Sequence, residues 1–464
     1  MRRELATIAA KAAGQVSRNL GIGGGTALPG LIAEGIDPGI VTDMSSCLGQ
    51  GSVLVTGTNG KTTTARLIRR VVNKVGLVAI GNREGSNMMR GIAASLAEAA
   101  GWQGTIPDAE RSMGVFEVDE ATLPKVAQVI GPRVVLFTNL FRDQLDRYGE
   151  VETVARLWQD AVAAWDNRST IVLNADDPSV ASLQGTASGK LLTFGIDDAS
   201  LTVGEVEHAS DARWCRTCGA ELAYSTVFYG HLGHWSCSKC QNRRRAPDVS
   251  CSRLVLDRDD MQMTVTTPSG QFEVSLSLTG VYNSYNALAA TATAIALGIA
   301  PDVTMEGLSG FTAAFGRQER MLIADREVEV ILAKNPAGLN QVLNTLVRAG
   351  EPMDVIFLLN DDIADGRDIS WIWDVDFEML QGRLRSLSVS GHRSWDMALR
   401  LKYAGLSDSP GVNSDTKTAL RHALAGTAPG GRLYVIPTYT AMLEARNVLG
   451  KWAGKGAFWE GDGG

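Results

Sequence analysis

The chain has 464 residues, a formal net charge of −7, and 45% hydrophobic and 20% charged residues. This length predicts two or three domains, and the composition is typical of soluble globular proteins. No apolar run reaches the roughly 18 residues that a membrane span needs. The acidic balance disfavours sequence-independent binding to nucleic acid, which depends on Lys and Arg neutralising phosphates, and Arg243–Arg245 are expected in a solvated loop.

The first 20 residues predict a helix. Its spacing places six apolar residues on one face: Leu5, Ile8, Ala9, Ala12, Ala13 and Val16. Arg2 and Arg3 look like the start of an export signal, but Lys11, Gln15 and Arg18 interrupt the apolar core. A cytoplasmic location is therefore expected, with peripheral contact to the cytoplasmic membrane as an option.

Short apolar runs alternate with helical stretches up to about residue 174, a pattern that favours a parallel sheet flanked by helices. The expected strands are Ser52–Val55, Gly114–Val118, Val134–Phe137 and Thr170–Leu173. From about 200 to 280 the texture is β-rich, suggesting an insertion with strands at Arg253–Leu256 and Met261–Thr266, and a helix is expected at Asn283–Leu297.

A domain boundary is expected near Arg320, dividing the chain into an ATP-binding domain (1–320) and a smaller C-terminal α/β domain (321–464). The expected strands of the second domain are Val328–Leu332, Asp354–Leu359, Leu387–Ser390 and Leu433–Ile436. This second domain is the expected site of partner binding.

A phosphate-binding loop is the strongest catalytic signal. After the strand at Val53–Val55 come Thr56 and then Gly57, Thr58, Asn59, Gly60, Lys61, Thr62 and Thr63. Backbone N–H groups of such a loop, together with the N-terminus of the following helix, bind phosphate oxygens. Lys61 would reach the β- and γ-phosphates, and Thr62 would place a hydroxyl on Mg²⁺. The strict P-loop pattern is broken at Val55, so a tight turn is the alternative.

Glu117 is the predicted carboxylate ligand of Mg²⁺, which prefers carboxylate and water oxygens. It lies near the end of an expected strand, and the carboxyl ends of parallel strands face the ligand crevice. Asp119 and Glu120 follow it. They either share this site or are surface charge, and the sequence leaves both readings open.

Four of the six cysteines form two pairs, Cys215-x-x-Cys218 and Cys237-x-x-Cys240, separated by 18 residues. This spacing predicts a structural four-cysteine zinc site within an insertion at about 205–250. His231 and His234 are alternative ligands, although ordinary loop histidines are favoured. Cys47 and Cys251 are expected to be buried thiols.

The loop from Gly57 to Thr63 resembles the ATP loop of Mur ligases and folylpolyglutamate synthases. Further segments resemble that family in the same order: Thr138–Leu140 with Asp143–Tyr148, Asn174–Pro178, Gly280–Asn286, Phe315–Arg320 and Ala333–Pro336. The resemblance implies that Asn283 contacts the nucleotide, with Asn286 the weaker choice. It also places Arg317 among the nucleotide-binding residues.

Three features narrow the resemblance to the MurT family, the Mur-like subunits of lipid II isoglutaminyl synthase. They are the glycine-rich start through Leu28-Pro29-Gly30, the paired cysteines inserted in the ATPase domain, and the segment Asp361–Trp371. Only 60 residues precede Lys61, too few for the separate domain that holds a nucleotide-sugar substrate in ordinary Mur ligases. A lipid-borne substrate would fit this absence.

Three positions depart from the wider family pattern. Gln144 replaces its metal-binding histidine, Gln159 falls about where many members carry a carbamylated lysine, and Ile331 replaces an aspartate. The resemblance therefore does not extend to the residues of a second metal site or of the usual carbamate.

The resemblance implies ATP-dependent phosphorylation of the D-glutamate α-carboxylate in the lipid II stem peptide, followed by attack of ammonia. Nothing in the sequence looks like a glutaminase, so a glutamine amidotransferase partner of the GatD type is implied. In the family, an aspartate of the C-terminal domain completes the partner's Cys–His pair. Asp365 and Asp368 are the two candidates, each also readable as a loop-capping aspartate.

Two other functions are possible. A ligase of this type could add an amino acid instead of ammonia, as folylpolyglutamate synthases do. The chain could also be an ATP-gated protein whose zinc module binds nucleic acid. The net charge of −7 argues against this function.

Overall fold

The computed structural model describes residues 1–20, 27–82, 86–142, 151–165, 167–202, 212–311, 317–348, 350, 352–407 and 410–454. The chain divides into two compact units, the first running to Phe311 and the second from Thr312, apart from short stretches around 142–149 and 207–210. Each unit carries its own sheet. No helix in these ranges is both long and apolar enough to cross a bilayer.

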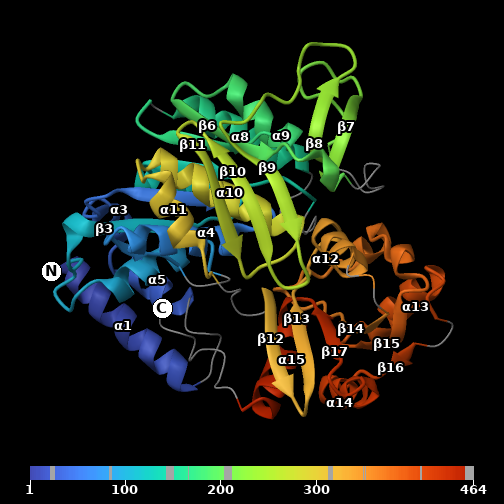
Figure 1. Cartoon of the computed structure of the whole chain (residues 1–464). Coiled ribbons are helices and arrows are strands. Elements are labelled where there is room, and N and C mark those ends of the chain that lie inside the picture. Colours follow the sequence, from blue (N-terminus) through green and yellow to red (C-terminus); the bar gives the residue numbers. More distant parts are fainter. Residues whose placement is uncertain are drawn as a thin grey trace. The chain divides into compact units, whose positions relative to one another are not determined.

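The sheet of the first unit confirms the expected parallel α/β class (Figure 1). Its strands run in the order β11-β10-β9-β6-β5-β4-β1-β3-β2, and those from β2 to β6 and β9 pair in parallel. Their bounds are β1 Ser52–Thr56, β2 Val78–Ile80, β3 Ser112–Glu117, β4 Val134–Phe137, β5 Thr170–Asn174, β6 Lys190–Ile196, β9 Val249–Leu256, β10 Met261–Thr267 and β11 Gly270–Leu276. Buried side chains occupy both faces of β1, β3 and β4, as expected for central parallel strands.

Only part of the expected β-rich insertion is separate from this sheet. The strand β9 pairs in parallel with β6, and β10 and β11 follow it antiparallel, so residues 249–276 extend the main sheet. A separate two-stranded sheet is formed by β7 (Leu222–Tyr229) and β8 (Leu232–Cys237), the hairpin that Figure 1 shows at the top of this unit.

Helices flank the sheet of the first unit. They are α1 Arg2–Leu20, α2 Ala27–Ile36, α3 Ile40–Ser45, α4 Lys61–Lys74, α5 Met89–Ala99, α6 Leu123–Ile130, α8 Val151–Ala164, α9 Pro178–Ala181, α10 Val281–Ala296 and α11 Pro301–Leu308. The helix α10 is buried along almost its whole length and packs on α4, the helix that follows the phosphate loop. Small side chains allow this close approach, since α10 is rich in Ala.

The predicted N-terminal helix is present, but the large side chains of its apolar face are not the buried ones. Its buried positions are Ala6, Thr7, Ala10 and Gly14, whereas Leu5, Ile8 and Val16 are exposed. The small residues form a stripe at helical spacing that lets α1 pack closely against α2 and α5. Its larger apolar side chains are thereby left on the outer surface.

The second unit holds a mixed sheet of order β12-β13-β17-β14-β15-β16, parallel except between β12 and β13. Its elements are β12 Arg317–Ile323, β13 Arg326–Ile331, α12 Pro336–Arg348, β14 Met353–Leu358, β15 Leu384–Ser390, α13 Ser394–Tyr403, β16 Gly411–Val412, α14 Thr416–Gly426, β17 Arg432–Pro437 and α15 Tyr439–Trp452. Two buried apolar clusters, one on each face, hold the helices to the sheet.

Candidate functional site

The phosphate loop lies between β1 and α4 and depends on two glycines. Gly57 and Gly60 have φ of 129° and 85°, in the region that disfavours side chains. A Cβ on Gly57 would also lie 2.1 Å from Thr138 Oγ1, and one on Gly60 would lie 2.1 Å from Asn286 Oδ1. The loop can therefore adopt this path only with glycine at both positions.

Lys61, the first residue of α4, is buried at the mouth of the loop. Its ammonium donates to the carbonyl oxygens of Gly57 (2.5 Å) and Thr58 (3.3 Å) and lies 3.0 Å from Glu120 Oε1. Glu120 is 6% exposed, so the reading of this residue as surface charge was wrong. Its carboxylate offsets the buried charge of Lys61 where the helix N-terminus also attracts anions.

Thr62 and Glu117, the two predicted Mg²⁺ ligands, come together in the fold. The hydroxyl of Thr62 donates to Glu117 Oε2 at 2.7 Å, and both side chains are buried. Two oxygen donors beside a phosphate loop fit a divalent cation that prefers oxygen ligands. Asn82 holds Glu117 in place, since its amide contacts the backbone N–H and carbonyl of Glu117 at 2.8 Å each.

Asn82 was missed by the sequence analysis. It follows the short strand β2, whose carboxyl end lies at the same edge of the sheet as that of β3. A polar residue at that position was the available signal. Asp119, the other acidic residue left open, is 4% exposed and accepts a bond from the N–H of Ala121, which makes it part of the turn before α6.

The two asparagines of α10 lie beside the loop at different distances from it. Asn286 faces Gly60 and accepts a hydrogen bond from Thr64 Oγ1 at 3.2 Å. Asn283 stands behind it, donating to the carbonyl of Thr279 and accepting from Asn286. Thr63 is buried in the first turn of α4. Arg317 begins β12, and its side chain is outside what the structure describes.

Residues after β4 fasten the other side of the loop. The N–H of Asn59 donates to Asn139 Oδ1 at 2.8 Å, and Thr138 Oγ1 donates to the carbonyl of Asn59 at 2.9 Å. The hydroxyl of Thr58 exchanges hydrogen bonds with the backbone of Phe141, at 2.9 and 3.0 Å. The segment Thr138–Leu140 therefore shapes the phosphate loop, whereas Asp143–Tyr148, including Gln144, lies outside the described residues.

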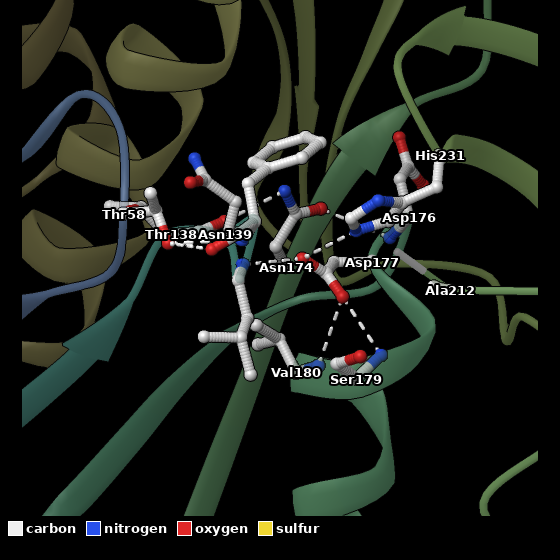
Figure 2. A network of polar contacts seen from close by, with 12 residues as sticks. Thr58, Thr138, Asn139, Asn174, Asp176, Asp177, Ser179, Val180, Ala212 and His231 are labelled. Atoms are coloured by element: carbon white, nitrogen blue, oxygen red, sulfur yellow. Dashed lines mark hydrogen bonds and ion pairs between the residues drawn. The ribbon is translucent and has the colours of Figure 1, made fainter. Parts of the chain in front are cut away.

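A buried acidic turn continues this network from Asn174 to Asp177 (Figure 2). Asp177 caps α9 by accepting from the N–H groups of Ser179 and Val180, and it accepts from the N–H of Leu140 at 2.7 Å. Burial raises the pKa of Asp176, although Arg244 at 2.6 Å opposes that shift. The expectation that Arg243–Arg245 form a solvated loop is wrong for Arg244, which is held in ion pairs with Asp176 and Asp197.

The four paired cysteines converge at one end of the β7–β8 hairpin. Their sulfur atoms all lie within 4.8 Å of one another. Sγ of Cys215 is 3.7 Å from that of Cys240, and Sγ of Cys218 is 3.4 Å from that of Cys237. Burial opposes deprotonation of Cys215, but N–H groups of Thr217 and Cys218 lower its pKa to about 6. Four convergent cysteine sulfur atoms are the donor set of a structural Zn²⁺ site, so these residues fit the predicted metal.

The two histidines lie outside this cluster. His231 lies in the hairpin turn, as expected of a loop histidine, but it is fully buried, with Nε2 3.4 Å from Asp177 Oδ2. His234 belongs to β8, and its Nε2 is 2.8 Å from the carbonyl of Ile196. Cys251 is buried as expected, but Cys47 is exposed, which contradicts the prediction of a buried thiol.

The two candidate aspartates lie in the acidic segment 361–371 of the second unit, and their exposure to solvent differs. Asp365 is 3% exposed and accepts from the N–H (2.8 Å) and hydroxyl (2.5 Å) of Thr440. Burial raises its pKa. Asp368 is exposed, and the N–H of Ser370, 2.8 Å from Oδ1, lowers its pKa. Asp368 thus presents an ionised carboxylate to solvent, whereas the carboxylate of Asp365 is buried and bound to Thr440.

Large exposed side chains gather on α13 of the same unit. Trp395, Leu399 and Tyr403 follow one another at four-residue spacing, with 73%, 49% and 72% of their surfaces exposed. The ring of Trp373 lies 5.6 Å from that of Tyr403. Such a stripe is typical of a surface that a partner covers.

Two positions that depart from the wider family have ordinary structural roles. Ile331 ends β13 in an apolar cluster. Gln159 lies on α8 with its amide 3.5 Å from Ser182 Oγ. Neither position supplies a charged group.

Two family descriptions match parts of the chain: Mur ligase middle domain over residues 55–235, and MurT ligase C-terminal over residues 332–442. The first range holds the phosphate loop and the first cysteine pair, Cys215 and Cys218. The second range holds the acidic segment 361–371 and the aromatic stripe, defined as the exposed residues Trp395, Leu399 and Tyr403 of α13.

Known proteins resemble most of the chain. The lipid II isoglutaminyl synthase (glutamine-hydrolyzing) subunit MurT of Streptococcus pneumoniae is 32% identical, covering 92% of this chain and 93% of that protein. The subunit of the same name from Staphylococcus aureus (strain COL) is 32% identical, covering 96% and 98%. A pseudomurein peptide ligase type C from Methanothermus fervidus shares the fold, with a TM-score of 0.66 and 23% identity over 86% of this chain and 78% of that one.

Proposed function

This chain belongs to the family of MurT subunits of lipid II isoglutaminyl synthase, and from that premise we propose which reaction its phosphate site performs. The substrate is the α-carboxylate of D-glutamate in the lipid II stem peptide, and the product is the D-isoglutamine amide. The chain is the ATP-dependent ligase subunit, and ammonia comes from a glutaminase partner of the GatD type.

The reaction has two steps. A carboxylate oxygen attacks the γ-phosphorus of ATP, forming an acyl phosphate as ADP leaves. Ammonia then attacks the acyl carbon, loses a proton, and displaces phosphate. The first step requires an in-line γ-phosphoryl group whose charge is offset.

The observation that carries this proposal is the arrangement at the N-terminus of α4. Lys61 would bind the terminal phosphates, and the loop N–H groups would fix their orientation. Thr62 and Glu117, 2.7 Å apart, would hold Mg²⁺, which withdraws charge from the phosphate oxygens when bound. Asn286 supports the loop at Gly60, and Asn283 supports Asn286 in turn.

Asp368 is the proposed third member of the partner's Cys–His pair. A carboxylate in that role orients the histidine and stabilises its charged form, which requires an exposed and ionised group. The exposure and lowered pKa of Asp368 support this choice, and the burial of Asp365 against Thr440 argues against the alternative. The aromatic stripe Trp395, Leu399 and Tyr403 is the proposed docking surface for the partner, giving a heterodimer.

Peripheral contact with the cytoplasmic face of the membrane is the third part of the proposal. The exposed apolar residues of α1, Leu5, Ile8 and Val16, support it, because an interfacial helix needs such a face. Co-sedimentation with lipid vesicles tests it. Leu5→Glu should reduce the bound fraction, and equal binding of both proteins would refute this part.

The central experiment measures amidation of lipid II by the chain with its partner. Lys61→Ala should lower ATP-dependent amidation on the order of 10²-fold or more while leaving glutamine hydrolysis by the partner intact. Lys125→Ala, an exposed lysine on α6, is the matched control. Unchanged amidation by Lys61→Ala would refute the assignment of the phosphate site.

An amino acid is the alternative nucleophile. Offering ammonium and a panel of amino acids to the chain without its partner separates the two reactions, because only amidation proceeds with ammonium alone.

A further inference from the structure

The β7–β8 hairpin, which carries the four cysteines at one end, reaches the phosphate loop at its other end. The side-chain amide of Asn59 in the loop donates to Tyr229 Oη at 3.1 Å, a contact between residues 170 positions apart. Tyr229 is 2% exposed and ends β7. The hydroxyl of a tyrosine from the cysteine hairpin therefore fixes a side chain of the loop.

The tip of the hairpin also packs against Phe141, whose backbone is hydrogen-bonded to Thr58, the loop residue before Asn59. The ring of Phe141 stacks on Tyr229 with centroids 4.9 Å apart, and it lies 4.3 Å from the ring of His231. Gly230, between them, has φ of 56°, and a Cβ there would lie 2.7 Å from the Phe141 ring. Because the backbone of Phe141 exchanges hydrogen bonds with Thr58, the hairpin supports Thr58 and Asn59 together.

The middle of the hairpin is anchored to the acidic turn after β5. The N–H of Gly233 donates to the carbonyl of Asp176 at 3.0 Å, and Trp235 Nε1 donates to the carbonyl of Ala175 at 3.1 Å. Trp235 also packs in an apolar cluster with Cys215 and Leu222. The tip, the anchor and the cysteine end therefore form one continuous set of contacts.

The cysteine end packs around a small apolar cluster. Its buried residues are Ala181, Cys215, Leu222 and Trp235. A cation bound by four sulfur atoms that lie within 4.8 Å of one another joins the two cysteine pairs, so metal binding at such a site supplies folding free energy.

We propose that Tyr229 is a positioning residue of the phosphate loop, and that metal bound by the four cysteines raises nucleotide affinity through this hairpin. The proposal rests on the proposed ATP site and deepens it, since it names the element that sets the shape of the loop. Linkage is reciprocal, so bound nucleotide must also retain the metal.

The test uses the full chain with its zinc and measures two quantities, the Kd for MgADP and the rate at which a chelator extracts zinc. Tyr229→Phe removes the hydroxyl but keeps the ring. It should weaken MgADP binding about fivefold, the effect of one hydrogen bond, with a full complement of zinc. Ser236→Ala, exposed on β8, should bind like the parent. Extraction of zinc should weaken MgADP binding between about 5- and 150-fold, and saturating MgADP should slow extraction from the parent.

The outcomes separate this inference from the function on which it rests. If the parent binds MgADP, but Tyr229→Phe has the parental Kd and MgADP does not slow zinc extraction, the coupling is refuted and the ATP site stands. If the parent does not bind MgADP at all, the proposed function fails first. Thermal unfolding of the zinc-free chain checks that a lost Kd reflects the hairpin and not global unfolding.

Discussion

The phosphate loop and the acidic segment 361–371 are both candidate catalytic regions, but they are built in opposite ways. At the loop, the reactive groups Lys61, Thr62 and Glu117 are buried and already in contact with one another or with neighbours. In the acidic segment the buried carboxylate, Asp365, accepts hydrogen bonds from Thr440, and the exposed one, Asp368, accepts from the N–H of Ser370.

This difference indicates what each region needs to work. A site that must hold a polyanion away from water requires charges arranged beforehand within one chain. A carboxylate that serves a histidine on another chain must instead remain accessible until that chain arrives. Under the proposed function, the loop is a complete site by itself, and the acidic segment is half of one.

The largest expected effect tests the half-site. Asp368→Asn should lower glutamine hydrolysis by the complex on the order of 10⁴-fold, because the histidine loses its orienting charge, whereas Asp365→Asn should leave hydrolysis within a few-fold of the parent. Ammonium-driven amidation should survive in both variants. Asp302→Asn, an exposed aspartate of α11, is the control. If Asp365→Asn, and not Asp368→Asn, stops glutamine hydrolysis, the assignment of the exposed aspartate to the partner's site is wrong.

A smaller loss is expected at the complete site. Glu117→Gln retains an oxygen but removes the charge, so amidation should fall on the order of 10²-fold and half-saturation should require more Mg²⁺. Titration of Mg²⁺ with and without the partner measures both quantities. Glu110→Gln, on the surface, is the matched control. A normal Mg²⁺ requirement in Glu117→Gln would remove this residue from the metal site.

The docking surface should respond less strongly. Trp395→Ala should weaken binding of the glutaminase by about 2 kcal/mol, roughly 30-fold in Kd, since exposed tryptophans are frequent hot spots. Trp102→Ala removes a tryptophan of similar exposure, 66%, from the first unit and should have no effect. Equal affinity of the parent and Trp395→Ala would place the partner elsewhere.

The smallest effect concerns pH. Because burial raises the pKa of Asp365 above 3.8, the folded chain binds its proton more tightly, and its contribution to the free energy of unfolding falls as pH rises through the raised pKa. Asp368, with a lowered pKa, behaves oppositely: its contribution is present above 3.8 and is lost as pH falls through the lowered pKa. Denaturation of the parent and both Asn variants at pH values around 3.8 measures this. The difference in unfolding free energy between the parent and Asp365→Asn should fall as pH rises, and the difference between the parent and Asp368→Asn should rise. Slopes of the same sign would mean that the two carboxylates have similar environments.

The order of elements and the phosphate loop could be predicted because their signals are local. Apolar runs bounded by turns predicted β1, β4 and β5 to within a residue, and glycines with Lys61 in a strand–loop–helix setting predicted the loop. The cysteine cluster was equally local, since two CxxC pairs need only one hairpin to meet. In each case the residues that define the feature are close in sequence or repeat a known spacing.

Other features depended on contacts between distant segments. Periodicity predicted an apolar face on α1, but small residues on its other face permit closer packing against α2 and α5, and that stripe is the one buried. Likewise, Glu117 and Glu120 are three residues apart, yet one meets Thr62 and the other meets Lys61. Composition cannot assign these partners, because the turn after β3 decides where each carboxylate points.

The sequence by itself therefore determined the fold class, the loop that would bind phosphate, and the thiols that would bind metal. Only the tertiary structure decided which aspartate is exposed, which asparagine faces Gly60, and that Tyr229 touches Asn59 across 170 residues. The physical reason is that chain connectivity and side-chain spacing encode local geometry directly. Burial and hydrogen bonding between remote segments follow from how all the elements pack at once.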